Sequence, residues 1–210
     1  MLQDELKKIN EQFRSNAPLE LVEKIESSIA KLAGSKLVMS SLKVGDKMPS
    51  FALFNATSKI IKSEDLLSNG PLVINFYRGG WWPFCNLELG GYQEIIDEIH
   101  RKGAQLVAIT PELPNETLST AEKLNLEYEI LSDTNNEIGK KFGIVFSMED
   151  ELKDVYKGFG VDLVTTQGND NFELPAPGTF VVDKNGFVLL AHVDVNHTSR
   201  MEPEEVLLVL

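Results

Sequence analysis

The chain has 210 residues, of which 42% are hydrophobic and 25% charged, so it is long enough to bury the core of one ordinary domain. Its 32 Asp and Glu residues outnumber 20 Lys and Arg residues, and the resulting formal net charge of -12 repels nucleic-acid phosphates and anionic membrane surfaces. The single cysteine, Cys85, excludes an intramolecular disulfide, a four-cysteine metal site and a dithiol redox cycle within the chain. We therefore expect one globular domain with neither a nucleic-acid nor a membrane partner.

The N-terminal region predicts a cytoplasmic protein. No segment of the sequence approaches the roughly 20 apolar residues that span a bilayer. Asp4 and Glu5 stand where a signal peptide carries its apolar run.

The first 43 residues predict a helical extension in front of the main domain. Apolar residues recur every three or four positions in Leu2–Phe13 and again, after Pro18, in Leu19–Leu32. Gly-Asp and Met-Pro pairs between residues 45 and 49 mark a boundary, so we expect the extension over residues 1–43 and the main domain over residues 44–210. The pattern leaves open whether the two helices pack on the chain's own sheet or form a dimer interface.

After a predicted hairpin at residues 51–62, the chain alternates between strand and helix patterns. Buried strands are expected at residues 72–77, 105–110 and 128–131, and each is followed by a helix pattern. Later, a Lys-Asn-Gly turn separates two further strands at residues 179–183 and 187–193. The sequence thus predicts an α/β fold with a central mixed sheet flanked by helices, its parallel portion first and an antiparallel hairpin last.

The only cysteine lies in the loop that follows the first buried strand, in the segment RGGWWPFC (residues 78–85). Ligands gather at the carboxyl ends of parallel strands, and the helix that starts here offers unpaired N–H groups and the positive end of its dipole. With a cation from Arg78, this setting predicts a lowered pKa for the Cys85 thiol. The residues leave open the alternative of an inert, buried Cys85 that packs beside Trp81 and Phe84, with Arg78 as a solvated loop charge.

The segment NFYRGGWWPFCNLE resembles the active-site segment of the peroxiredoxins, the alkyl hydroperoxide reductase and thiol-specific antioxidant family. One branch of that family reads Phe-Tyr-Arg-Gly-Gly-Trp-Cys-Pro-x-Cys-Asn-x-Glu-Leu, and the chain departs from it only at Trp82, which replaces the first cysteine. The likeness extends to VGDKMPSFAL and LPAPGTFVVDKNG and covers residues 42–210. It implies a thioredoxin-like, peroxiredoxin-type domain.

The resemblance also implies roles for the residues of the loop. Cys85 aligns with the peroxidatic cysteine and Glu88 with a family Glu, whereas Trp82 stands where most members have a threonine. The family arginine before the late strand is absent, and we take Arg78 as the hypothesis for its substitute. The expected catalytic residues are therefore Cys85 and Arg78, with a supporting active-site loop of Gly80, Trp81, Trp82, Pro83, Glu88 and Pro177.

Two further expectations concern a proline and a metal. Pro177 corresponds to the proline that is commonly cis and faces the cysteine loop in thioredoxin-like proteins, so we expect a cis bond before it. His192, Asp194 and His197 form a weak candidate for a metal site, but His197 lies beyond the strand that carries the other two. We expect neither a metal nor another cofactor.

The leading hypothesis is a thiol-dependent peroxidase in which Cys85 reduces hydrogen peroxide or a small organic hydroperoxide and becomes a sulfenic acid. Because the chain has no second cysteine, an external small thiol or a thioredoxin-like protein must regenerate it. One alternative is a catalytically impaired thioredoxin-like module whose adjacent tryptophans bind a partner. Another treats Trp82 as an alteration of a Cys-x-x-Cys thiol oxidoreductase. Peroxiredoxin-like proteins often dimerise, so a homodimer is expected.

Overall fold

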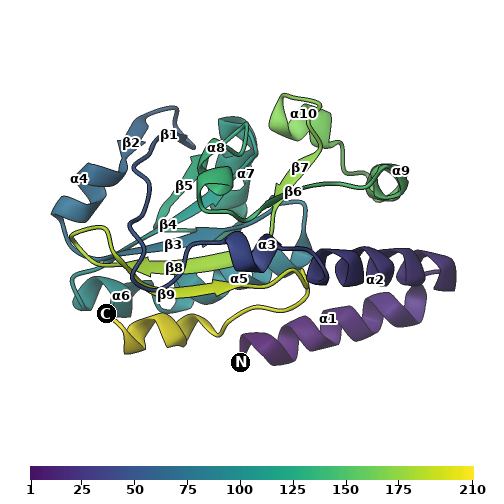
Figure 1. Ribbon diagram of the computed structural model, residues 1–210, viewed down its shortest axis with the longest axis horizontal. Coiled ribbons are helices and arrows are strands. Elements are labelled where there is room, and N and C mark those ends of the chain that lie inside the picture. The colour runs from purple at the N-terminus through teal and green to yellow at the C-terminus, as the bar shows by residue number, and fades with distance from the viewer.

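The computed structural model describes all 210 residues and contains a seven-stranded mixed sheet with helices on both faces (Figure 1). The strands lie in the order β2-β1-β5-β4-β3-β8-β9, and a separate two-stranded sheet pairs β6 with β7. Their bounds are β1 (Ala52–Asn55), β2 (Ile60–Lys62), β3 (Leu72–Phe76), β4 (Gln105–Thr110), β5 (Glu129–Ser132), β6 (Val145–Ser147), β7 (Glu173–Pro175), β8 (Gly178–Val182) and β9 (Val188–Val193).

Three helices precede the first strand, a 3-10 helix follows the last one, and the other helices lie in connections between strands. In chain order, the helices are α1 (Leu2–Asn16), α2 (Leu19–Ala33), α3 (Leu37–Ser40), α4 (Ser63–Ser68), α5 (Pro83–Glu94), α6 (Ile96–Arg101), α7 (Pro114–Leu124), α8 (Glu137–Lys141), α9 (Asp150–Gly158), α10 (Leu163–Gln167) and the 3-10 helix η1 (Pro203–Leu208). None of these helices combines the length and the apolar character needed to cross a membrane.

The predicted topology of the sheet is confirmed. Strands β3, β4 and β5 are parallel, β8 runs antiparallel to β3, and β9 returns antiparallel to β8 as the expected late hairpin. The predicted hairpin of β1 and β2 also forms. Strands β6 and β7 were not expected, because they are short and lie in a stretch without regular hydrophobic periodicity.

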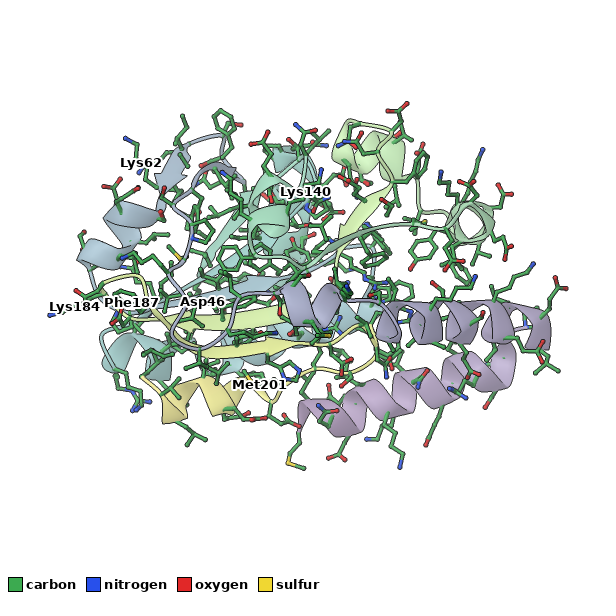
Figure 2. All side chains as sticks on the ribbon, in the orientation of Figure 1. Asp46, Lys62, Lys140, Lys184, Phe187 and Met201 are labelled. Carbon is green, nitrogen blue, oxygen red and sulfur yellow. The ribbon has the colours of Figure 1, made fainter.

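The two faces of the sheet bury separate hydrophobic cores because side chains alternate along each strand. Leu72 and Ile74 of β3 pack in the core shared with α8, while Val73 packs in the core shared with α5, α6 and η1. Figure 2 shows Met201 near η1, below strands β8 and β9, and Lys140 of α8 above them, while Lys62 lies on the edge strand β2. The loop after β3 emerges between these layers, which places the cysteine segment at the end of the sheet.

The N-terminal helices pack on helices of the chain's own domain, beside α5 and α9 rather than on the sheet (Figure 1). Leu2 and Leu6 of α1 contact Phe84 in the first turn of α5. The first N–H groups of α1 are accepted by the carboxylate of Glu202, at 2.9 and 3.0 Å, which is a favourable position for a negative charge. The predicted division of the chain into residues 1–43 and 44–210 stays a prediction.

Replacing Leu6 tests whether α1 is bound to the domain. Leu6 is 1% exposed, so we expect Leu6→Ala to lower the free energy of unfolding by about 2–5 kcal/mol, the usual cost of emptying a buried leucine site. Leu19→Ala is the control, because Leu19 is 73% exposed and should change stability by less than about 0.5 kcal/mol. Urea unfolding followed by circular dichroism measures both; equal effects would contradict the packing of α1.

Candidate active site

Cys85 lies in the first turn of α5, three residues after the N-cap residue Trp82, and its side chain is completely buried. Pro83 occupies the first helical position, where its missing N–H costs no hydrogen bond, and so favours a helix start here. The expected strand–loop–helix setting is therefore present. The sulfur itself faces the core that contains Val73, Tyr77 and Leu89, a more enclosed position than the loop sequence indicates.

An arginine from the C-terminal segment reaches the cysteine. The Arg200 Nη2 atom lies 3.5 Å from the Cys85 sulfur, and its Nε atom donates to the Glu88 carboxylate at 2.6 Å. Asn75 of β3 donates to the other oxygen of Glu88 at 2.9 Å and to Thr179 of β8 at 3.2 Å. This network joins α5, β3, β8 and the C-terminal segment around the thiol.

Burial dominates the electrostatics of the thiol. It raises the pKa of Cys85, Arg200 acts in the opposite direction, and Glu88 adds to the increase; the backbone N–H and the charge of Arg78 lower the pKa by smaller amounts. The expected lowered pKa is therefore wrong, because the sequence pattern shows the helix start and the cation but not the complete loss of solvent around the sulfur. Arg200 keeps its charge: burial opposes the charged form, but Glu88 and Cys85 raise its pKa.

Arg78 is buried rather than solvated, and its guanidinium group is directed to other partners. Its Nη1 atom donates to the Tyr156 hydroxyl at 3.2 Å, and the group lies 5.2 Å from the centre of the Phe146 ring. Only its backbone N–H and the more distant charge act on Cys85. The cation in contact with the sulfur is Arg200, which the sequence interpretation did not consider.

The two tryptophans belong to an aromatic cluster over the start of α5. Trp82 stacks on Tyr156, with ring centres 5.9 Å apart, and on Phe84 at 5.6 Å, while the His197 ring lies in a T-shaped arrangement with it at 5.1 Å. Trp81 contacts both Trp82 and Tyr156. Burial, followed by the charges of Arg78 and Arg200, holds the pKa of His197 well below its usual range, so its imidazole is uncharged.

The comparison with protein families covers most of the chain after the N-terminal helices. The model of the AhpC/TSA family matches residues 44–191, which include the cysteine loop and most of the sheet. The chain belongs to the AhpC/TSA family. The family resemblance of the NFYRGGWWPFCNLE segment is thereby confirmed.

Individual AhpC/TSA relatives are distant. A putative peroxiredoxin bcp of Buchnera aphidicola is 34% identical over 106 residues, 50% of this chain and 66% of that protein, which is just under two thirds of its length. Peroxiredoxin Bcp of Escherichia coli K12 is 28% identical over 106 residues, 50% of this chain and 67% of that protein. The chloroplastic peroxiredoxin Q of Populus jackii is 25% identical over 168 residues, 80% of this chain and 66% of that protein.

Solved structures agree on the thioredoxin-like fold. The peroxidoxin BcpB of Mycobacterium tuberculosis superposes with a TM-score of 0.60 at 22% identity, covering 75% of this chain and 91% of that one. A peroxiredoxin-like protein of Aquifex aeolicus gives a TM-score of 0.62 at 20% identity, covering 79% and 84%. Identities this low establish the fold, so the chemistry of this AhpC/TSA member must be argued from its own site.

The peptide bond before Pro177 differs from the expectation drawn from the family. Every peptide bond in the chain is trans, so the predicted cis bond before Pro177 is wrong. The chain passes in extended form from β7 into β8: Ala176 donates its N–H to Ile144, and the carbonyl of Pro177 accepts from Asp194. Pro177 is buried and adjoins Gly178, which pairs with Phe76 at the end of β3, so it still lies beside the start of the cysteine loop.

A buried carboxyl group, that of Glu112, forms a hydrogen bond with the backbone of the cysteine loop. Glu112, just after β4, accepts the Gly80 N–H at 2.8 Å, and Asn86 donates to the Gly80 carbonyl at 2.9 Å. A side chain at position 80 would collide with Thr120, because an added Cβ atom would lie 1.9 Å from the Thr120 hydroxyl, so glycine is required there. Burial raises the pKa of Glu112 to about 7. The hydrogen bond from Gly80 lowers this pKa, whereas the charge of Glu116 adds to the increase.

Three residues of the site escaped the sequence interpretation: Glu112, Tyr156 and Arg200. His197 was considered only as part of a weak metal-site candidate, not as a neighbour of the cysteine loop. Glu112 had a usable signal, because it follows the carboxyl end of a parallel strand in the sheet that carries the cysteine loop. No signal in the sequence points to Arg200, because it lies 115 residues from Cys85 in a segment without regular structure. No group of three or more metal-ligating side chains occurs, and His192 and His197 do not form such a site.

The carboxyl group of Glu112 predicts a pH dependence of stability. Its folded pKa of about 7 exceeds the ordinary value of 4.5, so the unfolded chain loses this proton at lower pH than the folded chain does. This contribution to stability is complete below pH 4.5, is lost as the pH rises to about 7, and stays lost above. We expect Glu112→Gln, which keeps an acceptor for Gly80, to be more stable than wild type by about 2–4 kcal/mol near pH 8.

Urea unfolding at several pH values measures this difference, which should vanish near pH 4.5. Glu122→Gln is the matched control, because Glu122 is exposed on α7 and its substitution should change stability by less than about 0.5 kcal/mol. A constant difference between Glu112→Gln and wild type over the whole range would contradict the raised pKa.

Proposed function

We propose that this AhpC/TSA family member is a thiol-dependent peroxidase that uses Cys85 as its single redox-active residue. The observation that carries the proposal is the contact of the Arg200 guanidinium with the Cys85 sulfur at 3.5 Å, in the first turn of a helix. A fixed cation beside the sulfur favours the thiolate and stabilises negative charge on a departing oxygen. The family membership supports the same chemistry.

In the proposed step, the thiolate attacks one oxygen of hydrogen peroxide or a small organic hydroperoxide. An S–O bond forms, the O–O bond breaks, and the departing hydroxide or alkoxide takes up a proton, which leaves a sulfenic acid on Cys85. An external thiol, either a small molecule or a thioredoxin-like protein, forms a mixed disulfide and releases water. A second thiol equivalent then restores Cys85 and leaves as a disulfide.

Access to the sulfur is part of this proposal. Cys85 has no exposed surface, and the side chains of Trp82 and Phe84 lie over the helix turn that carries it. Substrate contact therefore requires a local opening of the loop or of the N-terminal helices. Trp82 replaces the usual threonine hydroxyl with an indole N–H, which donates a hydrogen bond but accepts none. That N–H has no partner in the structure.

A thiol-coupled peroxidase assay tests the function. We expect wild type to consume peroxide, with a sulfenic acid trapped on Cys85, and Cys85→Ser to lose both signals. Ser199→Ala in the C-terminal segment is the control, because it leaves the thiol intact. Asn86→Ser is unsuitable as a control because the Asn86 side chain holds the cysteine loop. Equal rates for wild type and Cys85→Ser would overturn the proposal.

Substitution of Arg200 tests the role of its charge. Arg200→Met removes the cation, so we expect a higher pKa of Cys85 and a peroxide reaction about 10- to 100-fold slower. Arg200→Lys keeps a charge and should recover part of the rate, which loss of structure alone would not explain. Thiolate absorbance against pH and stopped-flow kinetics measure the two effects. An unchanged pKa in Arg200→Met would remove the argument for Arg200.

The aromatic cluster favours one alternative function, an impaired module that binds a partner through its tryptophans. Trp82 occupies the position of the first cysteine and stacks on both Phe84 and Tyr156. If Trp82→Cys gains disulfide reductase or peroxidase activity that wild type lacks, the alternative holds, and Trp82 is then an alteration of a Cys-x-x-Cys site.

The homodimer and the cytoplasmic location stay predictions. Light scattering at micromolar concentration measures whether the protein is a homodimer.

A further inference from the structure

A cavity of about 500 Å³ lies between the N-terminal helices and the cysteine loop. Phe13 of α1 and Ile25 and Ile29 of α2 line one side, and Trp81, Trp82 and Phe84 line the other. Sites for small molecules typically have volumes of about 300–1,000 Å³ and mostly apolar walls. This cavity meets both conditions. The helices that close it lie outside residues 44–191, so the family domain alone does not form it.

The charges around the cavity are already neutralised by the protein. Arg14 and Glu26, both at its edge, form an ion pair at 2.5 Å. His197 contributes an uncharged imidazole, and the chain as a whole carries a formal charge of -12. No free cation is therefore available for an anionic ligand, and no free carboxylate faces a cationic one. Because burial of an unpaired charge is costly, the walls favour an uncharged occupant.

We propose that this cavity is a binding site for one uncharged, mainly apolar small molecule, of the size of two or three aromatic rings. Aromatic side chains on both walls offer stacked and edge-on contacts to such rings. Asn10, Asn196 and Thr198 line the same cavity and supply polar groups for a single neutral polar substituent. The occupant lies against Trp82 and Phe84, over the helix turn that carries Cys85. The proposal does not rest on the thiol chemistry, because Cys85 does not line the cavity.

Two fluorescent probes with the same ring system test the proposal on the full chain. N-phenyl-1-naphthylamine is uncharged, whereas 8-anilinonaphthalene-1-sulfonate carries a sulfonate on the same rings. We expect the uncharged probe to bind one per chain with a Kd on the order of 10 µM, and the sulfonate at least about tenfold more weakly. The chain's two tryptophans both line the cavity, so the bound probe should quench most of the intrinsic tryptophan fluorescence.

Matched variants locate the binding. Ala30 lines the cavity and Ala33 does not, although both are exposed on α2, one helical turn apart. We expect Ala30→Phe to weaken the uncharged probe about tenfold or more by filling the cavity, and Ala33→Phe to leave its affinity unchanged. Val22→Phe, also at the cavity, is a second blocking variant. Circular dichroism verifies that each variant is folded.

The outcomes separate this proposal from the proposed peroxidase. Cys85→Ser should bind the probe as wild type does, so a failed peroxidase assay with intact probe binding affects only the enzymatic function. Absence of saturable binding, or equal binding by wild type, Ala30→Phe and Val22→Phe, would overturn the cavity as a ligand site. Equal affinity for the two probes would overturn the preference for an uncharged ligand.

Discussion

The buried ion pair between Glu88 and Arg200 is the interaction on which the site depends. Both side chains are at most 2% exposed, and they join α5, the helix that carries the cysteine, to a segment near the C-terminus. Removal of either partner would leave an uncompensated charge in the core, which typically costs about 3–5 kcal/mol. The pair also places the guanidinium group against the Cys85 sulfur. The same contact therefore orients the C-terminal segment and sets the charge around the thiol.

The site is a balance between burial and charge. Complete burial raises the pKa of Cys85, whereas Arg200 and Arg78 act against the increase. An enclosed thiol is protected from unwanted reaction, but its nucleophilic form is less populated than in an exposed loop. In such a site, any motion that admits substrate also admits water, which reduces the desolvation of the thiolate. Opening of the loop and activation of the sulfur are then linked in the proposed peroxidase.

The N-terminal helices have more than a covering role. They pack on α5 and α9, and Glu202 at the other end of the chain holds the start of α1. Their inner faces do not close completely on the cysteine loop, and the remaining space is the apolar cavity. Because Trp82 and Phe84 contribute to both the cavity and the cover over Cys85, a molecule bound there contacts the same side chains that restrict access to the thiol.

The parallel portion of the sheet, the hairpin at its end, the two N-terminal helices and the position of Cys85 at a helix start could all be predicted from the sequence. These features depend on local periodicity, turn residues and the family motif, all of which are contiguous in the chain. Four features became known only from the three-dimensional arrangement. Arg200 contacts Cys85, Glu112 accepts a hydrogen bond from Gly80, the bond before Pro177 is trans, and burial raises the pKa of the thiol. The physical reason is that desolvation and ion pairing depend on which distant segments meet around a group, and no local pattern records those contacts.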